Sequence, residues 1–124
     1  MTDYLSLEQG LRVARKAVGG PIEIRDLGLF DAALLRSQTS LFGQDAYPDL
    51  TVKGAALLHS VVADLPFVDG NKRAGWLLTY VFLARNGVEL DPVDDDSVYD
   101  LVIAVASGKM TELDEIADVL RTFV

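Results

Sequence analysis

Apolar residues recur at intervals of three and four along almost the whole chain, and this spacing restricts the folds open to it. The first run, which follows a capping-box pattern of Ser6 with Gln9, consists of Leu7, Leu11, Ala14 and Val18. Such spacing places side chains on one face of an α-helix. No stretch shows the strict alternation of a half-buried strand. We therefore predict an all-α fold, a compact bundle of about six helices.

Glycine and proline residues divide this pattern into six segments. Gly19-Gly20-Pro21 ends the first helix. The other predicted helices cover residues 27–36, 51–64, 71 to the stop at Asn86-Gly87, 97–107, and 111 to the C-terminus, the last capped by Thr111 with Asp114. In the second helix the residues expected to face the core are Leu27, Phe30, Ala33 and Leu34. In the fourth they are Leu77, Val81 and Ala84.

Two polar stretches lie between these helices. Residues 37–50 form a long loop for so small a chain, and loops of this kind serve as lids, partner surfaces or ordered connectors. The loop sequence leaves these alternatives open. Asp94, Asp95 and Asp96 precede the fifth helix, where carboxylates complement the helix dipole. Consecutive residues on a helix point in different directions, so a metal site formed by the three carboxylates is the less favoured of these two interpretations.

Composition sets limits on function. Residues 1–124 are expected to form a single domain, because 124 residues of which half are apolar can bury one core. No cysteine is present, so disulfides and thiolate metal sites are excluded. A net charge of −8 argues against direct nucleic-acid binding, although a local basic pocket for a small anion remains possible. The N-terminus does not resemble a signal peptide, and no apolar run is long enough for a membrane span, which favours a cytoplasmic protein without membrane contact.

The stretch most suggestive of chemistry is DLPFVDGNKR, residues 64–73. Gly70 lets the chain turn and lets a ligand approach the backbone just before the fourth helix. The first amides of a helix lack intrahelical partners and form an anion site with the helix dipole. Asn71 can donate to a phosphate oxygen, Arg73 can bind phosphate through two parallel hydrogen bonds, and Lys72 adds a mobile charge.

Asp69 supplies a hard oxygen ligand beside these groups. Magnesium in proteins commonly takes one or two carboxylates together with phosphate oxygens. The stretch therefore fits a site for magnesium and a phosphate-containing ligand. A helix start with two solvated cations fits the same residues, and physical chemistry alone does not separate the two interpretations.

The run PFVDGNKR followed by AGWLLTYVFLARNG resembles the motif of the Fic/Doc family, on its death-on-curing (Doc) toxin branch. Other stretches that resemble this branch are Asp26–Gln38, Ala46–Leu50 and Ala55–Ser60. The resemblance implies the Fic/Doc fold of about six helices. It also implies a toxin of a Phd–Doc type toxin–antitoxin module, a kinase that transfers the γ-phosphate of ATP to a threonine of elongation factor Tu and arrests translation.

By position, the resemblance implies magnesium at Asp69 and nucleotide phosphates at Gly70, Asn71, Lys72 and Arg73. The implied cofactors are thus ATP and Mg²⁺. AMP-transferring Fic enzymes have glycine where Lys72 stands, so lysine favours phosphorylation. The resemblance further implies a Phd-like antitoxin whose C-terminal segment folds on binding, in a groove near the motif and residues 37–50. Phe67 is expected to point into the core.

Leu65 departs from the family pattern, because it stands where the family has a histidine that acts as general base. Leucine cannot accept a proton, and a general base contributes roughly 10²- to 10⁴-fold in rate. We therefore expect this chain to be catalytically impaired. His59, the only histidine, lies on another helical face and is expected to be a packed, hydrogen-bonded residue. Asp64 is expected to point away from the site.

Two other functions remain open for the chain. One is an AMP-transferring Fic enzyme, against which Lys72 argues. The other is a non-catalytic module that binds the antitoxin and regulates its own operon, which Leu65 favours. The sequence also does not decide whether Leu65 is native or an inactivating change.

Overall fold

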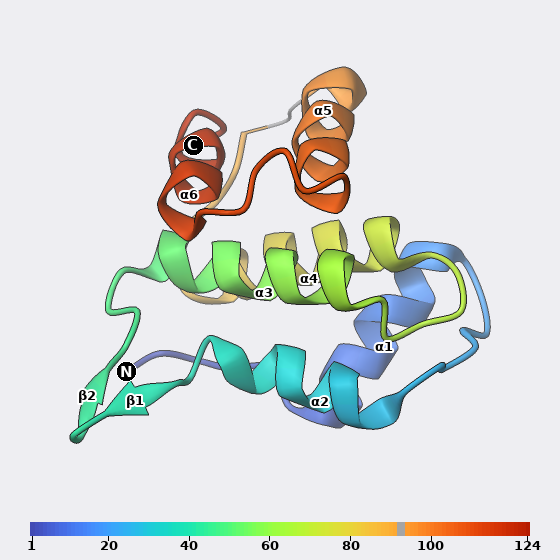
Figure 1. The fold of residues 1–124 in the computed structure, drawn as a ribbon, viewed down its shortest axis with the longest axis horizontal. Coiled ribbons are helices and arrows are strands. Elements are labelled where there is room, and N and C mark those ends of the chain that lie inside the picture. The colour runs from blue at the N-terminus through green and yellow to red at the C-terminus, as the bar shows by residue number, and fades with distance from the viewer. Residues whose placement is uncertain (92–93) are drawn as a thin grey trace.

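The computed structural model describes residues 1–91 and 94–124. Six helices account for most of them: α1 (Leu7–Val18), α2 (Leu27–Arg36), α3 (Leu50–Asp64), α4 (Asn71–Arg85), α5 (Asp95–Ala106) and α6 (Leu113–Arg121). They lie in three layers, with α3 and α4 across the middle, α1 and α2 on one side, and α5 and α6 on the other (Figure 1). The predicted all-α bundle of six helices is confirmed.

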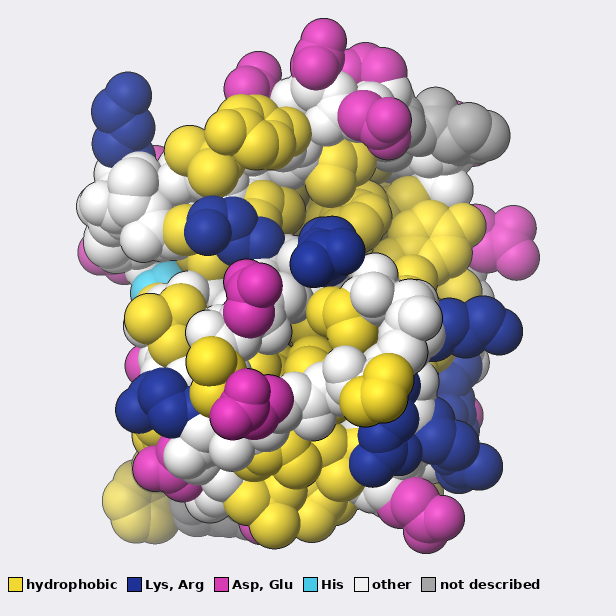
Figure 2. Space-filling model, turned by 90° about the vertical axis from the view of Figure 1, so that its right-hand side faces the viewer, with side chains coloured by type: hydrophobic (Ala, Val, Ile, Leu, Met, Phe, Trp, Pro, Cys, Tyr) yellow, Lys and Arg dark blue, Asp and Glu magenta, His cyan; other side chains and the backbone are white. Residues whose placement is uncertain are grey.

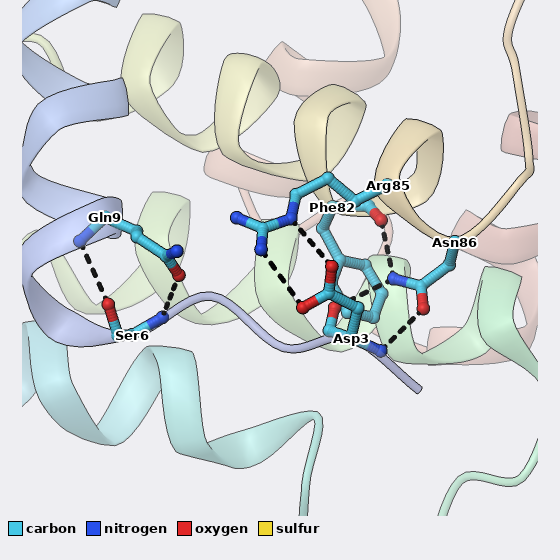
Figure 3. A network of polar contacts seen from close by, with 6 residues as sticks. All are labelled: Asp3, Ser6, Gln9, Phe82, Arg85 and Asn86. Carbon is cyan, nitrogen blue, oxygen red and sulfur yellow. Dashed lines mark hydrogen bonds and ion pairs between the residues drawn. The ribbon is translucent and has the colours of Figure 1, made fainter. Parts of the chain in front are cut away.

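Side-chain caps fix where most of the helices begin. The Ser6 hydroxyl accepts a hydrogen bond from the backbone N–H of Gln9, and the Gln9 side chain accepts one from the N–H of Ser6, which confirms the capping box (Figure 3). Carboxylates that accept from the first turn start α2, α3 and α5, at Asp26, Asp49 and Asp94. These bonds satisfy amides that would otherwise lack partners.

Two clusters of buried apolar residues fill the spaces between the layers. The first joins α1, α2, α3 and α4 around Phe30, Phe67 and Phe82. The second lies between the middle layer and α5 and α6, around Leu101, Ile116 and Leu120. Trp76 and Phe123 pack against both clusters, and their rings meet edge to face at 6.1 Å. The middle layer is thus covered on both sides.

The predicted inward face of α4 is wrong by one position. Leu77 and Val81 are only partly buried and Ala84 is exposed, whereas the fully buried apolar residues of α4 are Ala74, Leu78, Phe82 and Leu83. Because α4 is apolar on nearly all sides and packs between two layers, its sequence contains no clear polar face from which the inward direction can be inferred. Leu27 of α2 is also exposed, at 46%, against its predicted burial.

Two further predictions need correction. Helix α6 begins after Glu112 without a side-chain cap, so the predicted cap of Thr111 with Asp114 does not form. Residues 37–50 include a short antiparallel hairpin of β1 (Ser40–Leu41) and β2 (Gln44–Asp45), which the sequence did not indicate. Strands of two residues are too short to show alternation.

A buried lysine ties this hairpin to the bundle. Lys53 of α3 is fully buried. Its ammonium donates to the Ser37 carbonyl oxygen at 3.1 Å, pairs with Asp45 of β2 at 3.2 Å, and lies 5.3 Å from the ring centre of Tyr4. Burial lowers the pKa of Lys53, but its contacts with Tyr4 and Asp45 outweigh this and raise it above the usual value. Lys53 therefore stays charged and holds the hairpin in place.

The N-terminal residues are attached to the end of α4 (Figure 3). Both carboxylate oxygens of Asp3 accept hydrogen bonds from Arg85, at 3.0 and 3.1 Å. Asn86 accepts from the Asp3 N–H and donates to the Asp3 carbonyl oxygen. Asn86 is also the C-cap of α4, and Gly87 follows with φ of 84°, which confirms the predicted stop.

Candidate functional site

The loop between α3 and α4 is held by residues 22–26, which we call the strap. The N–H groups of Arg25 and Asp26 donate to the Pro66 carbonyl oxygen at 2.8 and 3.0 Å, and the Val68 N–H donates to the Glu23 carbonyl oxygen at 3.0 Å. Ile24 and Phe67 form an antiparallel bridge. The strap thus runs along the loop as a short extended segment and fixes its path.

Phe67 and Asn71 anchor the loop from the inside. Phe67 is buried, as predicted, with its ring centre 4.8 Å from that of Phe30. The buried Asn71 side chain accepts from the Phe67 N–H at 3.0 Å and donates to the Phe67 carbonyl oxygen at 2.9 Å. The structure therefore gives Asn71 a role in holding the loop, and its contact with phosphate stays a prediction.

Asp69 and Gly70 form the turn into α4. The exposed Asp69 carboxylate accepts from the Gly70 N–H at 2.8 Å. Gly70 has φ of 82° and is the N-cap of α4, where no side chain caps the first amides. A Cβ at Gly70 would lie 2.5 Å from Val18 Cγ1, so any other residue here would have to displace the Val18 side chain. Because no side chain caps them, the first amides of α4 remain available to an anion.

Lys72 and Arg73 extend from the first turn of α4 and are both exposed. They border a cavity of about 520 Å³. The residues that line it are Arg25, Leu65, Phe67, Val68, Asp69, Gly70, Asn71, Lys72, Arg73 and Tyr99. The structure thus brings all six sequence-predicted site residues, Leu65 and Asp69 to Arg73, to one cavity.

The chemistry of this cavity suits magnesium together with phosphate. Asp69 has one carboxylate oxygen bonded to the Gly70 N–H, which leaves the other free to act as a ligand. No group of three or more His, Asp or Glu side chains suited to a metal occurs among the described residues. Asp69 could hold magnesium together with phosphate oxygens, which is the arrangement that this ion usually adopts.

A second cavity, of about 340 Å³, adjoins the first between α4 and α5. Lys72, Arg73 and Tyr99 line both cavities. The remaining lining residues of the second are Trp76, Tyr80, Asp91, Asp95, Val98, Val102 and Ile103. Its walls are therefore aromatic and aliphatic, with cations on one side and carboxylates on the other. A flat ring could stack here while an attached phosphate reached Lys72 and Arg73.

Leu65 lies at the end of α3, in a left-handed backbone conformation with φ of 53° and ψ of 58°. Its side chain is half exposed and lines the first cavity.

His59 lines neither cavity. Instead its Nδ1 accepts a hydrogen bond from Arg36 at 2.8 Å, which confirms the prediction of a packed and bonded residue. Burial and the Arg36 charge lower the pKa of His59 below its usual value, although Asp64 acts in the opposite direction.

Two cavity residues were not found from the sequence. Arg25 comes from the strap, some forty positions before the motif, and Tyr99 comes from α5. Arg25 directly precedes the Asp26–Gln38 stretch, but nothing in that stretch points to the motif, and Tyr99 lies in no stretch that resembles the family. Only the folded chain brings the two residues to the loop. Figure 2 looks at the side of the molecule where α3 passes into α4, and shows basic side chains next to both acidic and apolar surface.

The fold and site define this chain as an all-α protein that presents an Asp-Gly-Asn-Lys-Arg turn at the start of its central helix. A sequence model of the Fic/DOC family matches residues 4–83, which extend from before α1 almost to the end of α4. The chain therefore belongs to the Fic/Doc family.

A relative agrees with this assignment over nearly the whole chain. It is named Toxin Doc, from Mycolicibacterium smegmatis, and it is 44% identical over an alignment of 124 positions, which covers 99% of this chain and 95% of the relative. The similarity thus continues through α5 and α6, beyond the part that the family model matches. Among the residues that the structure describes, no helix has the length and apolar character needed to cross a bilayer.

Proposed function

We propose that this chain is the toxin of a toxin–antitoxin system and a Doc-type kinase, with ATP as phosphate donor and a threonine of elongation factor Tu as acceptor. This target also implies a cytoplasmic protein. The proposal is supported by the similarity to a protein named Toxin Doc. The observation that carries it is the single cavity lined by Leu65, Asp69, Lys72 and Arg73.

Different residues of the two cavities would bind the phosphates, the magnesium ion and the adenine ring of ATP. Arg73 and Lys72 would neutralise phosphate oxygens, and the open amides of α4 would donate hydrogen bonds to the same group. Asp69 would hold magnesium, which when bound stabilises charge that develops on the transferring phosphoryl group. The adenine ring would enter the cavity between α4 and α5 and stack on its aromatic walls.

Position 65 explains why we expect this chain to transfer phosphate poorly. An acceptor hydroxyl that enters the first cavity meets an aliphatic side chain at Leu65. Without a group that accepts the hydroxyl proton, the rate should fall by roughly 10²- to 10⁴-fold. Because the phosphate and magnesium residues do not depend on Leu65, we expect ATP to bind normally.

The decisive experiment compares the chain with its Leu65→His variant. Each would be incubated with magnesium, elongation factor Tu, and ATP labelled on either the γ- or the α-phosphate. Leu65→Asn serves as a matched control, since asparagine also tolerates the left-handed backbone but is not a useful base. We expect γ-label to reach the target with Leu65→His, and little label with the other two proteins.

Other outcomes favour the alternative functions. Transfer of α-label would indicate an AMP-transferring enzyme, against the expectation from Lys72. Absence of transfer by Leu65→His, with ATP binding intact, would contradict the kinase proposal for this target. It would leave a module that binds the C-terminal segment of a Phd-like antitoxin. That alternative is favoured by the aliphatic residue at position 65.

A further inference from the structure

Arg25 donates three hydrogen bonds to the end of α3 and the α3–α4 loop, and the proposed function assigns it no role. Its side chain donates from Nε to the Leu65 carbonyl oxygen at 2.6 Å and from Nη2 to the Asp64 carbonyl oxygen at 2.7 Å. Its backbone N–H donates to the Pro66 carbonyl oxygen at 2.8 Å. One residue of the strap thus binds three successive carbonyl groups at the end of α3.

These bonds hold the backbone around Leu65, whose left-handed conformation is unfavourable for leucine. Leu65 and Phe42 are the two residues other than glycine with positive φ among those that the structure describes. Leucine adopts the left-handed conformation at a cost, and such a conformation persists only when its surroundings enforce it. Carbonyl groups at the end of a helix also need partners. The guanidinium of Arg25 supplies two of these partners at once through its fixed geometry.

We propose that Arg25 is a positioning residue, which holds residue 65 in its left-handed conformation and so directs the side chain at that position into the cavity. Arg25 itself lines the same cavity. The position of residue 65 then depends on the strap. Arg25 belongs to the strap, its backbone N–H pairs with Pro66 of the loop, and its side chain binds the carbonyl oxygen of residue 65. The catalytic meaning of this role rests on the proposed function, whereas the conformational role does not.

The conformational part can be tested without any activity, by amide hydrogen exchange of Arg25→Gln. The reporters are the N–H groups of Asp26 and Val68, both bonded between strap and loop. We expect both to exchange about tenfold faster or more, since the loss of two bonds from a charged donor loosens the strap. The Phe67 N–H is an internal control, because its partner is the Asn71 side chain. Arg12→Gln, on the exposed face of α1, is the matched control variant.

The catalytic part is tested in the Leu65→His background with ATP and elongation factor Tu. Misplacement of a catalytic group by about 1 Å can cost roughly 10²-fold in rate. We therefore expect Arg25→Gln to lower kcat about tenfold to a hundredfold and to leave KM for ATP within about twofold. Arg25→Lys should restore little of the loss, since one ammonium cannot bind both carbonyl groups in the same way.

The outcomes separate this inference from the proposed function. Unchanged exchange at Asp26 and Val68 in Arg25→Gln would overturn the conformational role, whatever the activity. An equal effect of Arg25→Gln and Arg12→Gln on kcat would overturn the catalytic role, as would full rescue by Arg25→Lys, which would indicate a role of charge alone. If Leu65→His transfers no phosphate, the proposed function fails, and the exchange measurement still decides whether Arg25 holds the strap against the loop that carries residue 65.

Discussion

At the scale of single residues, the ionisation of His59, the only histidine, depends on its burial and on the neighbouring charge of Arg36. The Arg36 guanidinium donates to His59 Nδ1 and also to the Ser60 hydroxyl at 2.9 Å. Arginine cannot accept a hydrogen bond, so the neutral imidazole must carry its proton on Nε2. Protonation of Nδ1 would break this contact and place two cations together. The lowered pKa of His59 follows from its burial and from this neighbour.

This pKa predicts how stability depends on pH. The unfolded chain titrates near the usual histidine value of 6.5 and the folded chain at a lower pH. Between these values the unfolded state binds more protons, so the contribution of His59 to stability is full above pH 6.5 and declines as the pH falls toward the folded pKa. We expect an NMR titration of the imidazole to give a midpoint below 6.5.

Two variants test the cause of this shift. Arg36→Gln removes the neighbouring cation, so it should raise the midpoint and flatten the stability profile between pH 7 and the folded midpoint. Asp64→Asn removes the carboxylate that acts in the opposite direction and should lower the midpoint. A midpoint that does not move in Arg36→Gln would show that the Arg36 charge does not cause the shift.

Single residues also show where sequence reasoning succeeds. Ser6, Gln9, Gly19 and Asn86 act within their own helix ends, and their local patterns identified the helix boundaries correctly. Arg25 acts across forty positions, and no local pattern connects it with Leu65. Contacts that are distant in sequence depend on how helices pack, which periodicity does not describe.

At the scale of elements, the junction between α1 and α4 depends on the absence of a side chain at Gly70. Gly70 and Gly87 have nearly the same φ, 82° and 84°, but a Cβ at Gly87 meets nothing within 4 Å. Gly87→Ala should therefore cost only the backbone penalty of about 1 kcal/mol. Gly70→Ala should cost about 1–3 kcal/mol more, because the new methyl group overlaps Val18.

Urea unfolding of the two alanine variants measures this difference directly. Val18→Ala combined with Gly70→Ala should recover part of the additional loss, since it removes the overlapping methyl groups. Equal destabilisation by Gly70→Ala and Gly87→Ala would show that α1 yields without cost. The same comparison monitored by ATP binding would show whether the start of α4 must keep its position for phosphate to bind.

Helix α4 shows why the elements were easier to predict than their orientation. Its ends were clear from Gly70 and Asn86-Gly87, and the structure confirms them. Its inward face was not, because Leu77, Leu78 and Val81 are all apolar and α4 meets helices on several sides. The direction of a helix that is apolar all round is set by its neighbours. The candidate site was largely predictable because the motif is continuous from Asp69 to Arg73.

At the scale of the whole molecule, charge is distributed unevenly between the layers. Residues 1–85 contain nine acidic and nine basic side chains, whereas residues 86–124 contain ten acidic and two basic ones. The entire net charge of −8 thus belongs to the part that includes α5 and α6. The layer that faces away from α1 and α2 is therefore the one least suited to contact with phosphate backbones.

Trp76 fluorescence can show whether the two apolar clusters unfold together, because Trp76 is the only tryptophan and contacts both clusters. We expect Leu120→Ala, in the second cluster, to cost about 2–5 kcal/mol. The unfolding midpoints from far-UV circular dichroism and from Trp76 fluorescence should shift together, as for one cooperative unit. Fluorescence that changes at lower urea concentration than circular dichroism would show that α5 and α6 separate before the rest unfolds.

The buried ammonium of Lys53 makes chemical footprinting with amine-reactive reagents informative. Of the four lysines, Lys16, Lys72 and Lys109 are exposed, and only Lys53 is enclosed. Acetic anhydride should thus modify these three lysines quickly in the folded protein. Acetylation at Lys53 would record each opening of the hairpin, and protection of Lys72 by ATP would record occupancy of the phosphate cavity. Mass spectra of samples acetylated with and without ATP would then follow both events in a chain that carries no substitution.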